Sequence, residues 1–310
     1  QLGVIKALEE AKLLKHIKSI SGTSIGAINT MLLLSKKNHK LMSMIWEEID
    51  ASDVFGTKGS LFDKESRMYS VEPLTQKLLQ MVNMKDVRRS RVKGYATSSL
   101  MYSKTSMSHQ INTETMEKRV FYLNKMQDPY KAVVASASMP IIFGPTKIDD
   151  FYYVDGGILD NYPVEPLLGD KCNLIFTVAL DTKFNPYLYD QLDINIIDFT
   201  SQEAFERSII KDSIDTLSFN QSFKDEKALL GYVVGQKLIE KMYQEGIIKK
   251  FLGMKFFKKL PEFKVIKLDE QEELHIKNLK LQTKKEFKKQ EKLKKKLDKR
   301  KVKNKQKSLE

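Results

Sequence analysis

The chain has 310 residues, of which 41% are hydrophobic and 9% aromatic, enough for one large folded domain and an appendage. The formal net charge of +13 is concentrated at one end. Residues 277–310 hold sixteen Lys or Arg and four Asp or Glu, which leaves a net charge of +1 for the rest. No run of 18 or more apolar residues occurs, which excludes a typical membrane-spanning helix, and a single cysteine excludes an intrachain disulfide.

The first 35 residues predict a helix, a short strand and a second helix. Apolar residues at helical spacing predict an amphipathic helix over residues 1–15. Residues 17–21 alternate apolar and polar side chains as a strand does, and residues 27–34 predict a buried helix. Between them lies Gly22-Thr23-Ser24-Ile25-Gly26, which has the form G-x-S-x-G. In serine hydrolases this motif forms a nucleophile elbow, a strained strand-to-helix turn that exposes the serine Oγ.

The elbow makes Ser24 the candidate nucleophile. We expect Gly22 and Gly26 to be needed because a Cβ atom would be crowded between the strand and the helix. The N-terminus of the following helix would offer backbone N–H groups to a developing oxyanion. On this motif alone, an ordinary strand-turn-helix corner with a surface serine remains an alternative.

The middle of the chain alternates strand and helix patterns. Predicted helices cover residues 39–55, 74–82 and 130–138, and predicted strands cover residues 92–98 and 118–123. This alternation favours an α/β fold with a mainly parallel sheet flanked by helices.

A second candidate group follows the aromatic and β-branched strand pattern of residues 151–154. Asp155-Gly156-Gly157 places a carboxylate beside two glycines, which allow a close approach to another loop. An isolated D-G-G sequence is more typical of a plain turn. The interpretation of Asp155 therefore depends on the neighbouring segments.

Three segments in this order resemble the patatin-like phospholipase family. They are the G-x-S-x-G elbow, an A-S-x-S-x-P-x-x-F-x-P stretch from Ala135 to Pro145, and Asp155-Gly156-Gly157 followed by Asn161 and Pro163. The resemblance covers about residues 1–245. It implies a modified α/β-hydrolase-like fold and a lipid acyl hydrolase of the phospholipase A or lysophospholipase type, with no metal and no cofactor.

The resemblance also implies a Ser-Asp dyad. Ser24 would be the nucleophile, and Asp155 the general base that takes its proton. An acyl-Ser24 intermediate would form on a phospholipid or lysophospholipid ester, and a water activated by Asp155 would hydrolyse it. Gly22 and Gly26 would shape the elbow, and Gly156 and Gly157 the turn that carries the base.

One element of the family pattern is not found. A glycine-rich G-G-G-x-R-G loop, whose N–H groups form the oxyanion hole, precedes the first helix in the family, whereas this chain opens with Gln1-Leu2-Gly3. The simplest interpretation is a fragment that lacks the first strand and this loop, and the alternative is a variant without them. We expect a cytoplasmic or peripheral membrane protein, with secretion left open because the native N-terminus would be missing.

The four histidines are poorly placed for a Ser-His-Asp triad. In α/β-hydrolases the histidine follows the acid in chain order, and only His275 follows Asp155. We expect His16, His39, His109 and His275 to lie in loops or face solvent. An esterase or thioesterase of small acyl substrates, dependent on His109 or His275, remains an alternative.

The remaining candidate groups are interpreted as structural. Cys172 precedes an apolar strand pattern and is expected to be a buried thiol. Asp150, Asp160 and Asp181 are expected to be turn or cap residues. No ligand spacing typical of a metal site occurs.

Residues 200–245 predict mainly helix, and the lysine-rich composition begins soon after. We therefore divide the chain into an acyl hydrolase domain, residues 1–250, and a partly helical or disordered basic tail, residues 251–310. The tail could be a solvated appendage or could bind anionic lipid headgroups. Nucleic-acid binding is disfavoured because few aromatic residues accompany the lysines. A non-catalytic lipid- or partner-binding scaffold is a third functional alternative.

Overall fold

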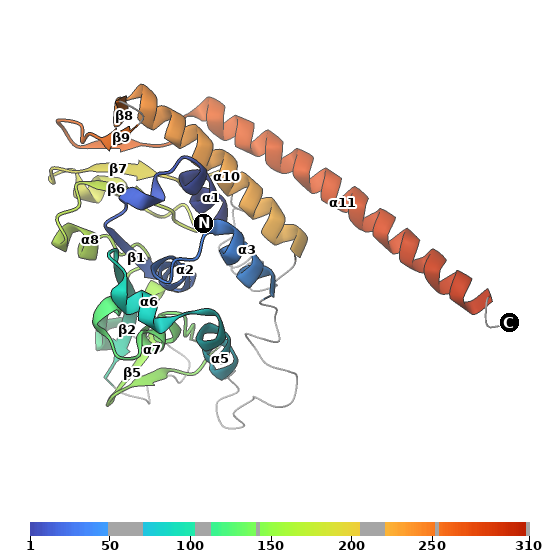
Figure 1. Cartoon of the computed structure of the whole chain (residues 1–310), viewed down its shortest axis with the longest axis horizontal. Coiled ribbons are helices and arrows are strands. Elements are labelled where there is room, and N and C mark those ends of the chain that lie inside the picture. The colour runs from blue at the N-terminus through green and yellow to red at the C-terminus, as the bar shows by residue number, and fades with distance from the viewer. Residues whose placement is uncertain (49–70, 103–112, 141–142, 205–220, 252–253, 308–310) are drawn as a thin grey trace.

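The computed structural model describes residues 1–48, 71–102, 113–140, 143–204, 221–251 and 254–307. The described strands form a five-stranded sheet, a three-stranded sheet and a two-stranded hairpin. Helices pack around both larger sheets (Figure 1). The α/β class and the flanking helices predicted from the sequence are confirmed.

The five-stranded sheet is mixed, where the sequence predicted a mainly parallel one. Only β1 and β2 are parallel, and the other pairs are antiparallel. Two residues separate β4 from β5, and so short a connection can join only antiparallel neighbours. The strands of this sheet are β1 (Ser19–Thr23), β2 (Lys93–Met101), β3 (Met116–Tyr122), β4 (Thr146–Ile148) and β5 (Phe151–Asp155).

The pairing register of β2 brings two distant strands together. β1 pairs with residues 93–97 of β2, and β5 pairs with residues 98–101. β3 pairs with residues 95–101 and therefore occupies the opposite edge of β2. β1 and β5 thus share one edge of β2, and their C-terminal ends meet end to end.

Helices from the first half of the chain build a hydrophobic core against this sheet. Its fully buried members include Ala27 and Met31 of α2, Ala96 of β2 and Val133 of α7. The predicted segments are found within a few residues of their expected bounds, except that the prediction for residues 39–55 extends beyond the described residues. These helices are α2 (Ile25–Leu34), α3 (His39–Glu48), α5 (Glu72–Met81), α6 (Met84–Arg89) and α7 (Pro129–Ser136).

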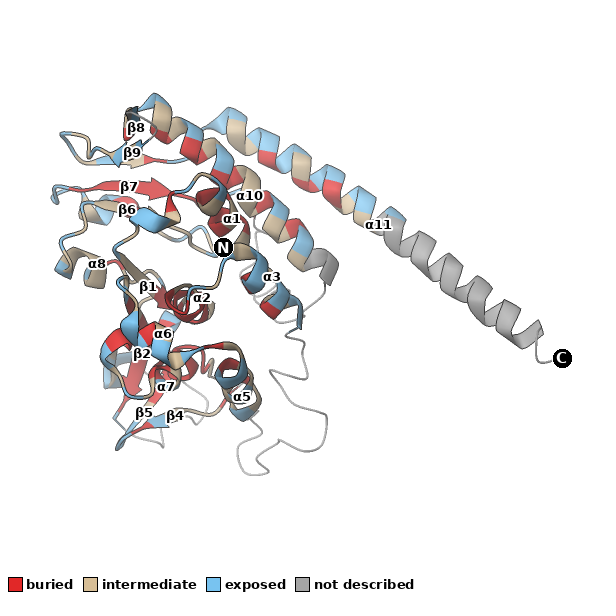
Figure 2. Cartoon of the chain, viewed as in Figure 1, coloured by how far each residue is buried: buried red, intermediate tan, exposed pale blue. Residues whose placement is uncertain are grey.

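The three-stranded sheet is entirely parallel, in the order β10-β7-β6. Its strands are β6 (Leu174–Thr177), β7 (Asn195–Asp198) and β10 (Lys264–Ile266). α1 (Leu2–Glu10) and α10 (Gln221–Gln244) pack together and against this sheet. Figure 2 shows buried residues along the inner sides of both helices. A smaller cluster joins the sheet to the start of α8 (Glu165–Gly169).

Residues beyond 250 also contribute to this second core. The hairpin of β8 (Ile248–Phe251) and β9 (Met254–Phe257) spans residue 250, and β10 pairs with β7. Leu268 and Ile276 are buried in the cluster that includes α1 and α10. Packing is therefore continuous across the domain boundary expected at residue 250, because apolar side chains persist among the lysines.

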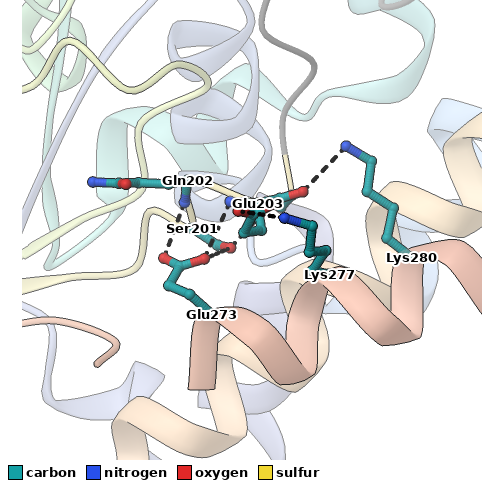
Figure 3. A network of polar contacts seen from close by, with 7 residues as sticks. Ser201, Gln202, Glu203, Glu273, Lys277 and Lys280 are labelled. Atoms are coloured by element: carbon teal, nitrogen blue, oxygen red, sulfur yellow. Dashed lines mark hydrogen bonds and ion pairs between the residues drawn. The ribbon is translucent and has the colours of Figure 1, made fainter. Parts of the chain in front are cut away.

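The last helix, α11 (Glu270–Lys307), is anchored near its start and then extends away from the body (Figure 1). The Glu273 carboxylate accepts hydrogen bonds from the Ser201 hydroxyl at 2.7 Å and from the backbone N–H groups of Gln202 and Glu203 at 3.0 and 3.1 Å (Figure 3). Lys280 donates to the Glu203 carbonyl at 3.1 Å. Within the described part of the chain, no helix combines the length and apolar character needed to cross a membrane.

Candidate active site

The two predicted site segments converge beside the middle of β2. Thr23 at the end of β1 pairs with Thr97, and Asp155 at the end of β5 pairs with the next residue, Ser98. The turn after Asp155 lies so close to β2 that a Cβ atom on Gly156 would stand 2.1 Å from the Thr97 carbonyl oxygen. The end-to-end meeting of β1 and β5 therefore brings the elbow and the D-G-G turn together.

Ser24 has the backbone geometry of a strained elbow. Its φ of 56° and ψ of −124° place a non-glycine residue in a region that costs about 1–3 kcal/mol. A Cβ atom on Gly22 would lie 2.2 Å from the Gly26 carbonyl oxygen, so the predicted crowding is found at Gly22. It is not found at Gly26, where a Cβ atom would meet only the Gln1 Nε2 atom, at 3.8 Å. The first turn of α2 leaves room on that side.

Asp155 is 5% exposed, and its two carboxylate oxygens differ in their hydrogen bonding. Oδ1 accepts a hydrogen bond from the Gly157 N–H at 2.8 Å. Oδ2 is buried and has no hydrogen-bond partner among the described residues. Burial raises the pKa of Asp155 to about 6, against the smaller opposing effects of the Ser24 hydroxyl and the Gly157 N–H. Oδ2 is therefore left available to accept a further hydrogen bond.

Both residues line a cavity of about 1250 Å³. Residues of β1 and β6 line this cavity. Among the described strands, β1 is an edge strand of the five-stranded sheet and β6 is an edge strand of the three-stranded sheet. Apolar side chains that also line it include Ile25 of α2 and Met139 and Phe143 from the segment between α7 and β4. Part of the cavity wall next to the elbow is therefore apolar.

Three of the four histidines lie in the described residues. His39 pairs with the Glu9 carboxylate at 3.0 Å, and His275 is exposed on α11. His16 lines the cavity, with its ring centroid 5.3 Å from that of Phe257. None of the three forms a hydrogen bond with Ser24 or Asp155 in the described structure. His109 lies outside the described residues.

Of the three acidic residues expected to be turn or cap residues, Asp150 lies in the turn between β4 and β5, and the other two have local hydrogen bonds. Asp160 accepts the Tyr162 N–H at 3.0 Å, and Asp181 accepts the Lys183 N–H at 2.8 Å. Cys172 is half-buried, whereas the sequence predicted a buried thiol, because it lies at the margin of the small cluster beside α8. In the residues that the structure describes, no group of three His, Cys, Asp or Glu side chains could hold a metal ion.

One residue that contacts the elbow directly, Ser136, was not among the residues predicted to belong to the site. The Ser24 N–H donates to the Ser136 hydroxyl at 2.9 Å, and that hydroxyl donates to the Thr97 carbonyl at 2.6 Å. Ser136 belongs to the A-S-x-S stretch on which the family resemblance rests. Its position in this motif could have marked Ser136 as a site residue. The motif does not indicate, however, which backbone groups the Ser136 hydroxyl contacts.

Comparisons with known proteins identify a family and several relatives. Residues 1–168 match the family model described as "Patatin-like phospholipase". The "Probable lipid hydrolase 463L" of Invertebrate iridescent virus 6 is 24% identical over 185 residues, which cover 54% of this chain and 61% of that protein. The "Uncharacterized protein R571" of Acanthamoeba polyphaga mimivirus is 27% identical over 157 residues, which cover 48% and 50%. The matches thus span about half to three-fifths of these curated relatives.

A solved structure is also similar. It is the crystal structure of VipD from Legionella pneumophila, with a TM-score of 0.40 and 14% identity. The match covers 92% of this chain and 63% of the VipD chain.

Proposed function

This chain belongs to the patatin-like phospholipase family, and from that premise we propose that it is a lipid acyl hydrolase that cleaves carboxylic esters of phospholipids or lysophospholipids. One observation carries the proposal. A strained serine and a buried carboxylate with an unpartnered oxygen converge from separate strands and line the same cavity. The name of the viral relative 463L, a probable lipid hydrolase, supports the same class of reaction.

In the proposed mechanism, Asp155 is the general base. With a pKa of about 6 it is mainly ionised at neutral pH, and the Gly157 N–H holds its Oδ1 atom. Oδ2 takes the Ser24 proton as Oγ attacks the ester carbonyl carbon, and the proton passes to the departing alkoxide when the tetrahedral intermediate collapses. Water attacks the acyl-Ser24 ester, gives its proton to Asp155, and releases the fatty acid as Ser24 Oγ regains a proton.

The start of α2 supplies groups for the negative charge on the carbonyl oxygen. The N–H groups of Ile25 and Gly26 have no hydrogen-bond partner among the described residues, as is usual in the first turn of a helix. The Ser24 N–H is already donated to Ser136. We assign the stabilising role on this side of the site to the free N–H groups of α2, whose helix dipole also favours negative charge. The glycine-rich loop of the family would add donors to this set.

The lysine-rich helix α11 is the basis for a proposed attachment to lipid surfaces. Residues 277–310 carry a net charge of +12, and α11 extends from the body that holds the cavity (Figure 1). We propose that this charge attracts anionic headgroups and makes the protein a peripheral membrane protein. Co-sedimentation with phosphatidylserine vesicles should be strong at low salt and weak at high salt. Equal binding to phosphatidylcholine vesicles would contradict an electrostatic attraction.

The catalytic proposal is tested with a fluorophosphonate probe, which forms a covalent adduct with an activated serine. Full-length protein is incubated with the probe, and mass spectrometry locates the adduct. We expect labelling of Ser24, no labelling of this site in Ser24→Ala, and much slower labelling in Asp155→Asn. A His275→Ala control should label at the wild-type rate. Absence of an adduct on folded wild-type protein would favour the non-catalytic scaffold, and dependence on His109 or His275 would favour the histidine esterase.

A further inference from the structure

The end of α7 contacts both halves of the proposed dyad. Ser136, the last residue of α7, is fully buried. Its hydroxyl accepts the Ser24 N–H at 2.9 Å and donates to the Thr97 carbonyl at 2.6 Å. Two residues later, the Ser138 carbonyl accepts the Asp155 N–H at 2.9 Å. One short segment therefore forms hydrogen bonds with the backbone of the nucleophile and with that of the base.

The hydrogen-bond directions at Ser136 are fixed by its partners. A backbone carbonyl can only accept, so the Ser136 hydroxyl proton must point at Thr97. A lone pair is then left to accept the Ser24 N–H. Thr97 is also the β2 residue that pairs with Thr23, immediately before Ser24. The Ser136 hydroxyl therefore links Ser24 to Thr97, the β2 residue that pairs with the last residue of β1.

We propose that Ser136 is a positioning residue that holds Ser24 in its reactive conformation, an inference that rests on the proposed role of Ser24 as nucleophile. The Ser24 backbone is strained, and such a conformation persists only where the surroundings over-determine it. The Ser136 hydroxyl is one such constraint, because rotation of the strained peptide would break its hydrogen bond with the Ser24 N–H. Because the Ser136 hydroxyl already accepts the Ser24 N–H, the oxyanion would be stabilised by the next N–H groups, at the start of α2.

The test compares Ser136→Ala with Ser35→Ala. Ser35 is the matched control because it lies at the far end of α2, is also buried, and also donates its hydroxyl to a backbone carbonyl, that of Leu32, at 2.9 Å. We expect Ser136→Ala to lower kcat by about ten- to a hundredfold with little change in KM, because a displaced nucleophile affects the chemical step more than substrate binding. Fluorophosphonate labelling of Ser24 should slow by a similar factor. Ser35→Ala should keep wild-type kcat.

Ser136→Cys provides a second variant of nearly native volume. A thiol is a weaker donor and acceptor than a hydroxyl, so its kcat should fall between those of Ser136→Ala and wild type. Wild-type kcat and labelling rate in folded Ser136→Ala or Ser136→Cys would overturn the positioning role. If wild-type protein itself neither labels nor hydrolyses ester, the proposed function fails instead, and the two failures are therefore distinguishable.

Discussion

The two larger sheets use their buried polar groups differently. Around the first sheet, polar side chains gather where β1, β2, β5 and α7 meet, and Asp155 keeps an oxygen without a partner. In the second sheet, the buried Asn195 amide bonds to the Glu262 carbonyl and the Leu260 N–H, and Asp198 bonds to Thr177 and Thr200. The second set joins strands to loops. The first set includes an unpartnered carboxylate oxygen, that of Asp155, in the same cavity as Ser24, which is why we assign catalysis to the first sheet and support to the second.

If catalysis belongs to the first sheet, the largest loss of activity should follow substitution of Asp155. Asp155→Asn keeps the shape of the side chain but removes the proposed base, so kcat should fall by about 10²–10⁴-fold. Stability should not fall, because the variant removes a charge that burial disfavours. Steady-state kinetics and urea unfolding would measure the two quantities. Unchanged kcat in the folded variant would contradict the division of roles between the sheets.

A core substitution near the second sheet should show the reverse behaviour. Leu238 on α10 is fully buried in the second cluster, and Leu238→Ala should lower the free energy of unfolding by about 2–5 kcal/mol. The kcat of the folded fraction should stay close to the wild-type value. Leu229→Ala, on the same helix at 41% exposure, is the control and should change stability by only about 0.5 kcal/mol. A selective loss of kcat in Leu238→Ala would mean that the second sheet also shapes the site.

Two glycines of the elbow sharpen the contrast within the first sheet. Gly22→Ala would force a Cβ atom against the backbone of α2 and should destabilise the protein by about 1–3 kcal/mol. Gly26→Ala meets only ordinary contacts inside a helix and should be neutral or stabilising by up to about 1 kcal/mol. Thermal or urea unfolding of the pair gives the measurement. Equal destabilisation would show that the motif needs both glycines for steric reasons.

Much of the architecture could be predicted from the sequence because its signals are local. The elbow serine lies between a strand and a helix as its motif predicted, and most predicted elements are found near their expected bounds. The mixed sheet could not be predicted, because pairing direction depends on which strands meet in space. The roles of Ser136 and Thr97 were missed for the same reason, since a buried hydroxyl and a distant backbone carbonyl have no common sequence pattern.

The smallest and most specific prediction concerns pH. The proposed base must be ionised, so kcat/KM should fall as pH drops through about 6, to roughly a tenth of its plateau at pH 5. The same shift affects stability in the opposite direction. The pKa of Asp155 is raised from 3.8 to about 6 on folding, so its stabilising contribution is complete below about 4 and is lost as pH rises through 6.

Between pH 4 and 6, activity should therefore rise while the contribution of Asp155 to stability falls. The difference in unfolding free energy between wild type and Asp155→Asn, measured across this range, isolates that contribution from those of other carboxyl groups. An acidic limb of kcat/KM near pH 4 would mean that Asp155 titrates as an ordinary exposed carboxyl. In that case burial at the end of β5 would not raise the pKa of Asp155, and the two sheets would no longer differ in the electrostatic environment of their buried carboxyl groups.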